Sequence, residues 1–135
     1  LTLDDGVQFV LDSIARMQGG EIFVPKIPSL GITDLASTIA PDCEIREVGI
    51  RPGEKLHEVL ISEDEARTAI EFDDHYIIEP AHPYWVSEDR GGKAVPDGFS
   101  YASDTNDEWL TPVQVLAMAR EVEREQGLGD TRKSA

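Results

Sequence analysis

The chain has 135 residues, which is the size of one ordinary domain and short for an enzyme that must bind both a cofactor and a second substrate. Its 27 acidic residues outnumber the 12 Lys and Arg residues, and the formal net charge of −15 argues against a broad phosphate-contacting surface for nucleic acid. The composition, 40% hydrophobic, is that of a folded chain, and no apolar run approaches the roughly 20 residues of a membrane-spanning helix.

The number of cysteines and the first residues of the chain carry information on the cellular compartment and on whether the chain is part of a longer one. Cys43 is the only cysteine, so an intrachain disulfide is impossible and a cytoplasmic location is the default expectation. The chain starts at Leu1, has no basic leader, and enters a helix-start pattern at once. We therefore expect a piece of a longer chain.

The first elements are a helix and a short strand. Thr2 is a favoured N-cap, and apolar residues recur at helical spacing over residues 3–17 until Gly19 and Gly20 interrupt them. Residues 21–24 are short, β-branched or aromatic and end at a proline, which indicates a strand.

A loop, a second helix and a second strand are expected next. Residues 26–31 form a Pro-containing loop, and Thr33 with Asp34 opens a short helix that ends before residues 41–42. Residues 43–48 alternate apolar and polar side chains, which predicts a strand with Cys43 on its inward face as a small core residue.

The middle of the chain mixes short elements. The apolar residues between 56 and 61 fit either a helix or a strand, because so brief a run does not fix the period. Ser62 and Glu65 form a capping-box pattern for a helical turn through Ala69, and residues 76–78 indicate a strand.

The last third is mostly irregular until its final helix. Residues 80–100 carry several Pro and Gly and are expected to be a long loop, whereas Thr111 and Pro112 begin a helix with an apolar stripe. Residues 127–135 are a polar tail. Helices and strands without a regular βαβ order predict an α+β unit over residues 1–126.

The most informative local pattern is Arg-Pro-Gly-Glu, at residues 51–54. Arg51 offers a planar fork of donors that fits phosphate oxygens, and Glu54 is an acceptor for vicinal hydroxyl groups such as those of ribose. Pro52 and Gly53 between them favour a tight turn. An ordinary Pro-Gly turn with a solvated ion pair is the alternative, and the four residues alone favour it.

Few other residues are candidates for binding. An anionic ligand needs some of the scarce cations to be gathered in one place, and four candidates lie in one third of the chain: Lys26, Arg46, Arg51 and Lys55. For Lys26 a solvated loop lysine is favoured over a role in ligand binding, and for His57 a surface or packing histidine is favoured. Residues 73–75, Asp-Asp-His, lack a recognised ligand spacing, so no metal is expected.

Several longer runs carry a family resemblance. They are GGEIFVPKIPS at residues 19–29, ITDLA at 32–36 and GIRPGEKLHE at 49–58, followed by matches from residue 71 through Tyr101 to 106–110. Together they resemble the inverting UDP-N-acetylglucosamine 4,6-dehydratases, which are extended short-chain dehydrogenase/reductase enzymes. The resemblance covers nearly the whole chain except its tail.

The resemblance implies an α/β enzyme with two halves. An N-terminal Rossmann half binds NADP, and a smaller C-terminal half, to which this chain corresponds, closes over the UDP-sugar. Arg51 would contact the diphosphate and Glu54 the uridine ribose, and the complete enzyme would be a homo-oligomer. The reaction is oxidation at C4 of the sugar, loss of water across C5 and C6, and return of the hydride to C6 with inversion at C5.

No catalytic or cofactor-binding residue is expected in this chain. It has no Gly-x-x-Gly-x-x-Gly run after a strand, and none of Tyr76, Tyr84 and Tyr101 is followed by Lys at the fourth position. Two alternatives stay open. One is a UDP-sugar epimerase or reductase of the same superfamily, which uses a similar Arg-x-Gly-acid pattern, and the other is a stand-alone interaction module without catalysis.

Overall fold

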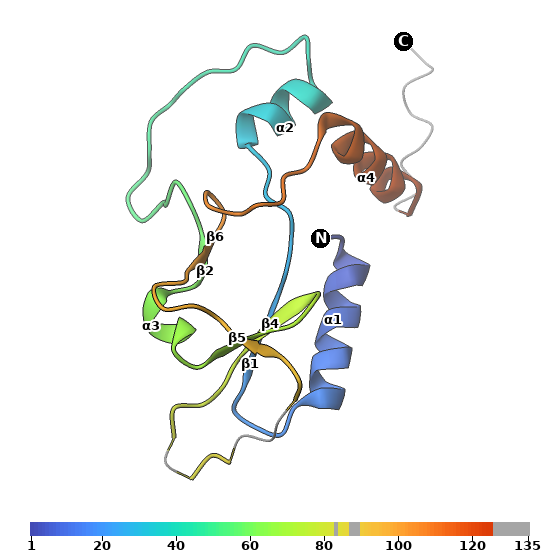
Figure 1. The fold of residues 1–135 in the computed structure, drawn as a ribbon. Coiled ribbons are helices and arrows are strands. Elements are labelled where there is room, and N and C mark those ends of the chain that lie inside the picture. Colours follow the sequence, from blue (N-terminus) through green and yellow to red (C-terminus); the bar gives the residue numbers. More distant parts are fainter. Residues whose placement is uncertain (83, 87–89, 126–135) are drawn as a thin grey trace.

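The structure is a computed structural model that describes residues 1–82, 84–86 and 90–125. It contains helices and strands in mixed order, which confirms the α+β expectation (Figure 1). The helices are α1 (Leu3–Arg16), α2 (Ile32–Ile39), α3 (Glu63–Ala66) and α4 (Pro112–Glu125). The strands are β1 (Ile22–Pro25), β2 (Val59–Ile61), β3 (Ala69–Glu71), β4 (His75–Ile78), β5 (Lys93–Ala94) and β6 (Tyr101–Ala102).

Helix α1 begins where the sequence predicts. The Thr2 hydroxyl accepts a hydrogen bond from the Asp5 N–H at 3.2 Å, and the Asp5 carboxylate accepts one from the Thr2 N–H at 3.0 Å. This reciprocal capping box satisfies two backbone donors that the first helical turn leaves without partners. The helix ends with Met17 as its C-cap, as expected.

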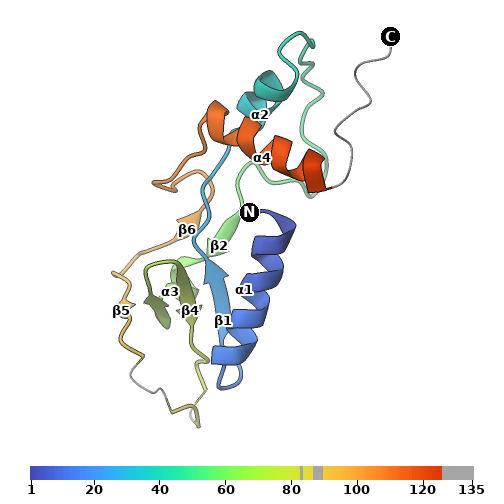
Figure 2. The ribbon, with the colours of Figure 1, turned by 90° about the vertical axis from the view of Figure 1, so that its right-hand side faces the viewer.

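Strand β4 lies inside an antiparallel sheet of four strands, in the order β1-β4-β3-β5. All four of its residues are buried, because both faces of the sheet are covered. On one face His75 packs among aromatic rings that include Phe9 of α1, which runs alongside the sheet (Figure 2). On the other face Tyr76 and Ile78 belong to the main hydrophobic core.

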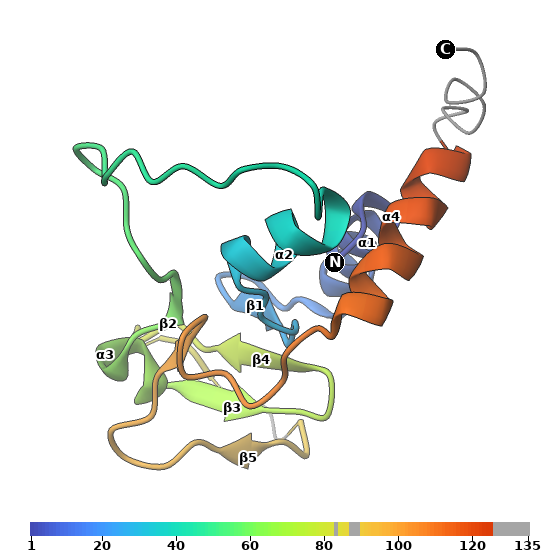
Figure 3. The same ribbon diagram turned by 90° about the horizontal axis from the view of Figure 1, so that it is seen from above.

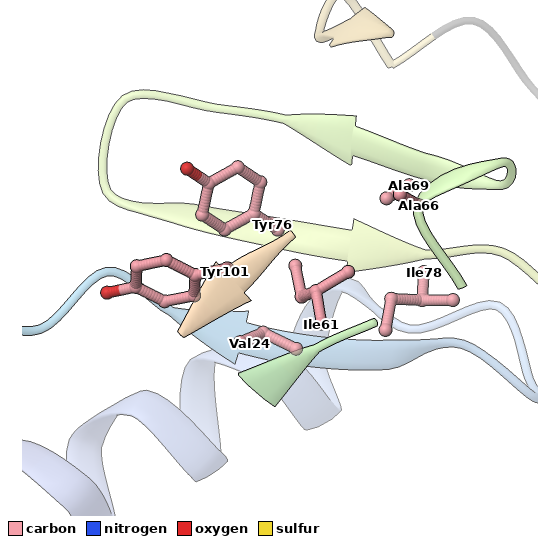
Figure 4. Packing of buried hydrophobic residues seen from close by; sticks show 7 residues of the cluster. All are labelled: Val24, Ile61, Ala66, Ala69, Tyr76, Ile78 and Tyr101. Atoms are coloured by element: carbon pink, nitrogen blue, oxygen red, sulfur yellow. The ribbon is translucent and has the colours of Figure 1, made fainter. Parts of the chain in front are cut away.

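The hydrophobic core lies between this sheet and a small antiparallel pair formed by β2 and β6. Ile61 of β2 is completely buried and lies beside Ile78, while Tyr101 of β6 lies beside Tyr76 (Figure 4). The two tyrosine rings are 5.2 Å apart at their centroids, which is a favourable aromatic contact. Residues far apart in the sequence thus close one core.

Helices α2 and α4 lie against each other at one end of the molecule (Figures 1 and 2). Pro112 is the first residue of α4, as predicted, and the Thr111 N–H donates to the Gln114 side chain at 2.8 Å. Helix α2 begins one residue before the predicted Thr33. The predicted tail at residues 127–135 lies outside the described residues.

Among the described helices, none has the length and apolar character needed to cross a membrane.

Three sequence predictions about residues 43–69 are wrong. Residues 43–48 form no strand, since no neighbouring strand pairs with them, and Cys43 is exposed instead of lying in the core. The helix that opens at Ser62 ends at Ala66 and not at Ala69. Ala69 instead starts β3, which pairs with β4. These errors share one cause, because a short segment becomes a strand only where tertiary structure supplies a partner.

A buried ion pair fastens the start of β1 to the segment after residue 89. The Glu21 side chain is fully buried, and its carboxylate accepts hydrogen bonds from the backbone N–H groups of Gln18 and Gly19 and from the Arg90 guanidinium. Burial would raise the pKa of Glu21, but the hydrogen bonds from Gln18, Arg90 and Gly19 outweigh it and lower this pKa to about 2. Glu21 is therefore ionised in the folded chain.

We expect Glu21→Gln to lower the free energy of unfolding by about 2 to 3 kcal/mol, because it leaves Arg90 buried beside a neutral group. The folded pKa lies below the ordinary value of 4.5, so the charge on Glu21 stabilises above pH 4.5 and this contribution is lost as the pH falls toward 2. Urea unfolding at several pH values measures both effects. Glu47→Gln, at an exposed position, is the control, and equal stability of the two variants would contradict this assignment.

Candidate functional site

The Arg-Pro-Gly-Glu residues form a tight turn. The Glu54 N–H donates to the Arg51 carbonyl at 3.0 Å, and Gly53 has a φ of 86°, which side-chain-bearing residues rarely adopt. Pro at the second position and a positive-φ Gly at the third are typical of a type II turn. The Glu54 carboxylate also accepts from the Arg51 N–H at 2.7 Å, so the turn is closed by backbone and side chain together.

The two charged side chains of this turn face solvent. Arg51 is 80% exposed and Glu54 is 47% exposed, and Arg51 Nε lies 3.7 Å from Glu54 Oε1. An ion pair at that distance and exposure contributes little to stability. The geometry by itself is that of a Pro-Gly turn with a solvated ion pair. It leaves most of the guanidinium donors available to an anion.

The turn lies on a long exposed loop. Residues 41–58 run as an arc from the end of α2 to the start of β2, and every one of them is exposed (Figures 1 and 3). Ile45, Val48, Ile50 and Leu56 are among the exposed apolar residues of the chain. The structure thus presents the candidate residues on a loop that the described body does not cover.

Lys26 is not the solvated loop lysine that the sequence predicts. Its Nζ lies 2.7 Å from Glu71 Oε1 and 4.9 Å from the centroid of the Tyr76 ring. Burial would lower the pKa of Lys26, but the hydrogen bond to Glu71 and the nearby Tyr76 and Glu71 charges raise it. Lys26 and Glu71 line two small cavities, of about 160 and 240 Å³.

Tyr101 and Asn106 hold the segment that carries Lys26, which sequence reasoning missed. The Tyr101 hydroxyl accepts from the Ile27 N–H at 2.8 Å and donates to the Ile27 carbonyl at 3.0 Å. The Asn106 side-chain amide donates to the same carbonyl at 2.7 Å and to Ser29 Oγ at 3.1 Å. Tyr101 and Asn106 stand in a stretch of the sequence with little periodic pattern. Nothing in that stretch reveals that their partners are Ile27 and Ser29.

The other candidate residues are His57 and residues 73–75, which make contacts with neighbouring side chains. His57 is at the surface, with Nε2 at 3.7 Å from Asp104 Oδ2. His75 Nδ1 lies 2.6 Å from Asp74 Oδ1, a hydrogen bond that lowers the pKa of Asp74 despite the opposing effect of burial. The His75 ring is buried, whereas Asp73 and Asp74 are exposed. Within the described ranges, no cluster of three His, Cys, Asp or Glu residues is arranged to hold a metal ion.

Comparison with known proteins gives the family. Residues 1–80 match the family described as polysaccharide biosynthesis protein. Because this match covers more than half of the chain, the chain belongs to that family. Similar proteins of known activity indicate which enzymes the chain resembles within this family.

Two groups of curated relatives are similar to this chain. UDP-N-acetylglucosamine 4,6-dehydratase (inverting) of Campylobacter jejuni is 44% identical over 132 residues, which cover 91% of this chain and 39% of that enzyme. UDP-glucose 4-epimerase of Rickettsia massiliae is 37% identical over 82 residues, which cover 58% of this chain and 24% of that enzyme. The chain therefore spans well under half the length of either relative, and its likeness to the dehydratase confirms the resemblance drawn from the sequence.

A solved structure also shares the fold. The X-ray structure of Pen from Bacillus thuringiensis superposes on this chain with a TM-score of 0.71 at 27% identity. The superposition covers 95% of this chain and 38% of that one. The arrangement of helices and strands described above therefore recurs as part of a longer protein.

The Lys26 pair yields a stability prediction. We expect Lys26→Met to lower the free energy of unfolding by about 1 kcal/mol, since it removes a half-buried ion pair and a cation–π contact. Arg67→Met is the matched control, because the Arg67–Asp64 pair is at least 78% exposed and should contribute less than about 0.5 kcal/mol. Urea denaturation compares the two, and an equal loss in both would show that Lys26 is effectively solvated.

Proposed function

We propose that this chain is the UDP-sugar-binding portion of a UDP-N-acetylglucosamine 4,6-dehydratase. The observation that carries the proposal is the 44% identity to the Campylobacter jejuni enzyme, which extends over 91% of this chain. The complete enzyme would oxidise C4 of the sugar, eliminate water across C5 and C6, and return the hydride to C6 with inversion at C5. On the same resemblance we propose a homo-oligomer, and the single cysteine supports the proposal of a cytoplasmic location.

In this proposal Arg51 binds the diphosphate and Glu54 binds the ribose. The exposed guanidinium of Arg51 supports its role, because a planar fork of free donors matches phosphate oxygens in a bidentate manner. Glu54 uses Oε2 to close the turn, which leaves Oε1 as an acceptor for a ribose hydroxyl. The turn would hold the two groups at a fixed spacing.

The cofactor would be bound elsewhere in the complete enzyme. Dinucleotides bind at the carboxyl ends of parallel strands, beside a Gly-rich turn and a helix N-terminus. The named strands of the described residues pair only in antiparallel fashion, and the segment between β1 and α2 carries Pro28 in place of a Gly-rich turn. These residues do not fit NADP, so we assign its binding and the hydride chemistry to an N-terminal Rossmann half.

A second candidate is a UDP-sugar epimerase. The 37% identity to UDP-glucose 4-epimerase over 82 residues favours it, and a nucleotide held by Arg51 and Glu54 would serve either reaction. Incubating the full-length protein with UDP-N-acetylglucosamine separates the two. A 4-keto-6-deoxy product, detected by the mass of one lost water, supports dehydration, whereas an epimer of unchanged mass contradicts it.

Nucleotide binding tests the roles of the turn directly. We expect Arg51→Ala in the full-length protein to weaken UDP binding by about 10- to 100-fold, since it removes one charge-assisted contact worth about 1.5 to 3 kcal/mol. Arg51→Lys should weaken binding somewhat less, because a point charge replaces the bidentate fork. Isothermal calorimetry with UDP gives the dissociation constants.

Arg46→Ala is the matched control for this experiment. Arg46 is also exposed on the loop of residues 41–58 and carries the same charge, but it lies outside the turn. Its removal should change UDP affinity by less than about threefold, which is the long-range effect expected of one screened charge. If Arg51→Ala bound UDP as tightly as the wild-type protein, the assignment of Arg51 would be wrong.

A further inference from the structure

The loop of residues 41–58 is tied to the body at its two ends. At its start, the Cys43 N–H donates to the Ala40 carbonyl at 3.1 Å. At its end, Glu58 exchanges two hydrogen bonds with Ser103. All the residues between them are exposed.

Ser103 holds Glu58 through both its backbone and its side chain. The Ser103 N–H donates to the Glu58 carbonyl at 2.8 Å, and the Glu58 N–H donates to the Ser103 hydroxyl at 3.0 Å. The two residues directly continue the pairing of β2 with β6, whose neighbouring pair is Val59 and Ala102. Here a hydroxyl replaces the backbone carbonyl that a regular ladder would use. The side chain of residue 103 therefore decides whether the last bond forms.

The end held by Ser103 is the one that restricts the turn. Glu58 lies four positions after Glu54, so the chain between them spans at most about 14 Å when fully extended. Arg51 lies eight positions after Cys43, and that segment reaches about twice as far, roughly 28 Å. An anchor at Glu58 consequently limits the positions of the turn far more than the anchor at Cys43 does.

A second contact lies next to this anchor. His57 Nε2 is 3.7 Å from Asp104 Oδ2, so the residues that precede Glu58 and follow Ser103 also face each other. Both side chains are substantially exposed, and such a contact contributes little by itself. Beyond the β2–β6 pairing that begins at Val59, the hydrogen bonds of Ser103 are therefore the stronger restraint at this end.

We propose that Ser103 is a positioning residue for nucleotide recognition, which holds Glu58 and thereby sets where Arg51 and Glu54 meet the ligand. The proposal rests on the function proposed above, because it takes UDP as the ligand of the turn. Ser103 itself does not contact the ligand. It acts by reducing the number of loop conformations that binding would otherwise have to select from.

The experiment compares variants of Ser103 in the full-length protein. We expect Ser103→Ala to raise the dissociation constant for UDP about fivefold, the effect of losing one neutral hydrogen bond that restrains the loop. Ser103→Thr keeps the hydroxyl, and its dissociation constant for UDP should be within about twofold of the wild-type value. Amide exchange at Glu58 is a readout that needs no ligand, and it should become faster in Ser103→Ala only. Ser100→Ala, an exposed serine in the same region, is the control.

The outcomes separate this proposal from the one on which it rests. Wild-type UDP affinity in Ser103→Ala, together with loss of binding in Arg51→Ala, would overturn the positioning role alone. Failure of Ser103→Thr to restore binding would also overturn it, since the hydroxyl would then not be the cause. Unchanged binding in Arg51→Ala would overturn the proposed function and the positioning role with it.

Discussion

The burial of β4 on both faces is the constraint on which the rest of the structure depends. A strand so covered needs partners on both edges and layers on both sides, and β1, β3, α1 and the β2–β6 pair supply them. The β2–β6 pair has its place because Ile61 and Tyr101 fill the core against β4. The start of β2 in turn fixes where the exposed loop returns to the body.

The cations that could contact an anionic ligand are few, and they differ in how the fold places them. Of the four cations gathered in one third of the sequence, Lys26 is neutralised by Glu71 within the body. The other three, Arg46, Arg51 and Lys55, are exposed on the loop that the body does not cover. The same loop also carries Asp42, Glu44, Glu47, Glu54 and Glu58, so a negatively charged ligand would be held by direct contacts with Arg51 and not by a net positive field.

The two parts of the candidate site differ in how they are held. The Arg51–Glu54 turn is closed by local hydrogen bonds between residues three apart, so its shape does not depend on the rest of the fold. Its location does depend on the fold, because Ser103 comes from a distant part of the sequence. Binding loops on a rigid scaffold commonly combine a turn that is held by local hydrogen bonds with a position that is set by contacts to distant residues.

Features set by short-range chemistry are predictable from the sequence. The Thr2 capping box and Pro112 at the first turn of α4 are examples, since a helix end is determined by residues within one turn of it. The Arg-Pro-Gly-Glu turn belongs to the same class. The family is also readable, because long runs of matching residues carry it.

Features that need a distant partner are not predictable in this way. Residues 43–48 have the alternation of a strand but no neighbour to pair with, whereas Ala69–Glu71 has little strand signal and pairs with β4. Lys26 is likewise paired through Glu71, far along the chain. The sequence by itself determined the starts of α1 and α4, the turn and the family, because local bonding and residue identity suffice for them. Only the tertiary structure decided strand pairing, burial and the anchoring of the loop, since each depends on contacts between distant segments.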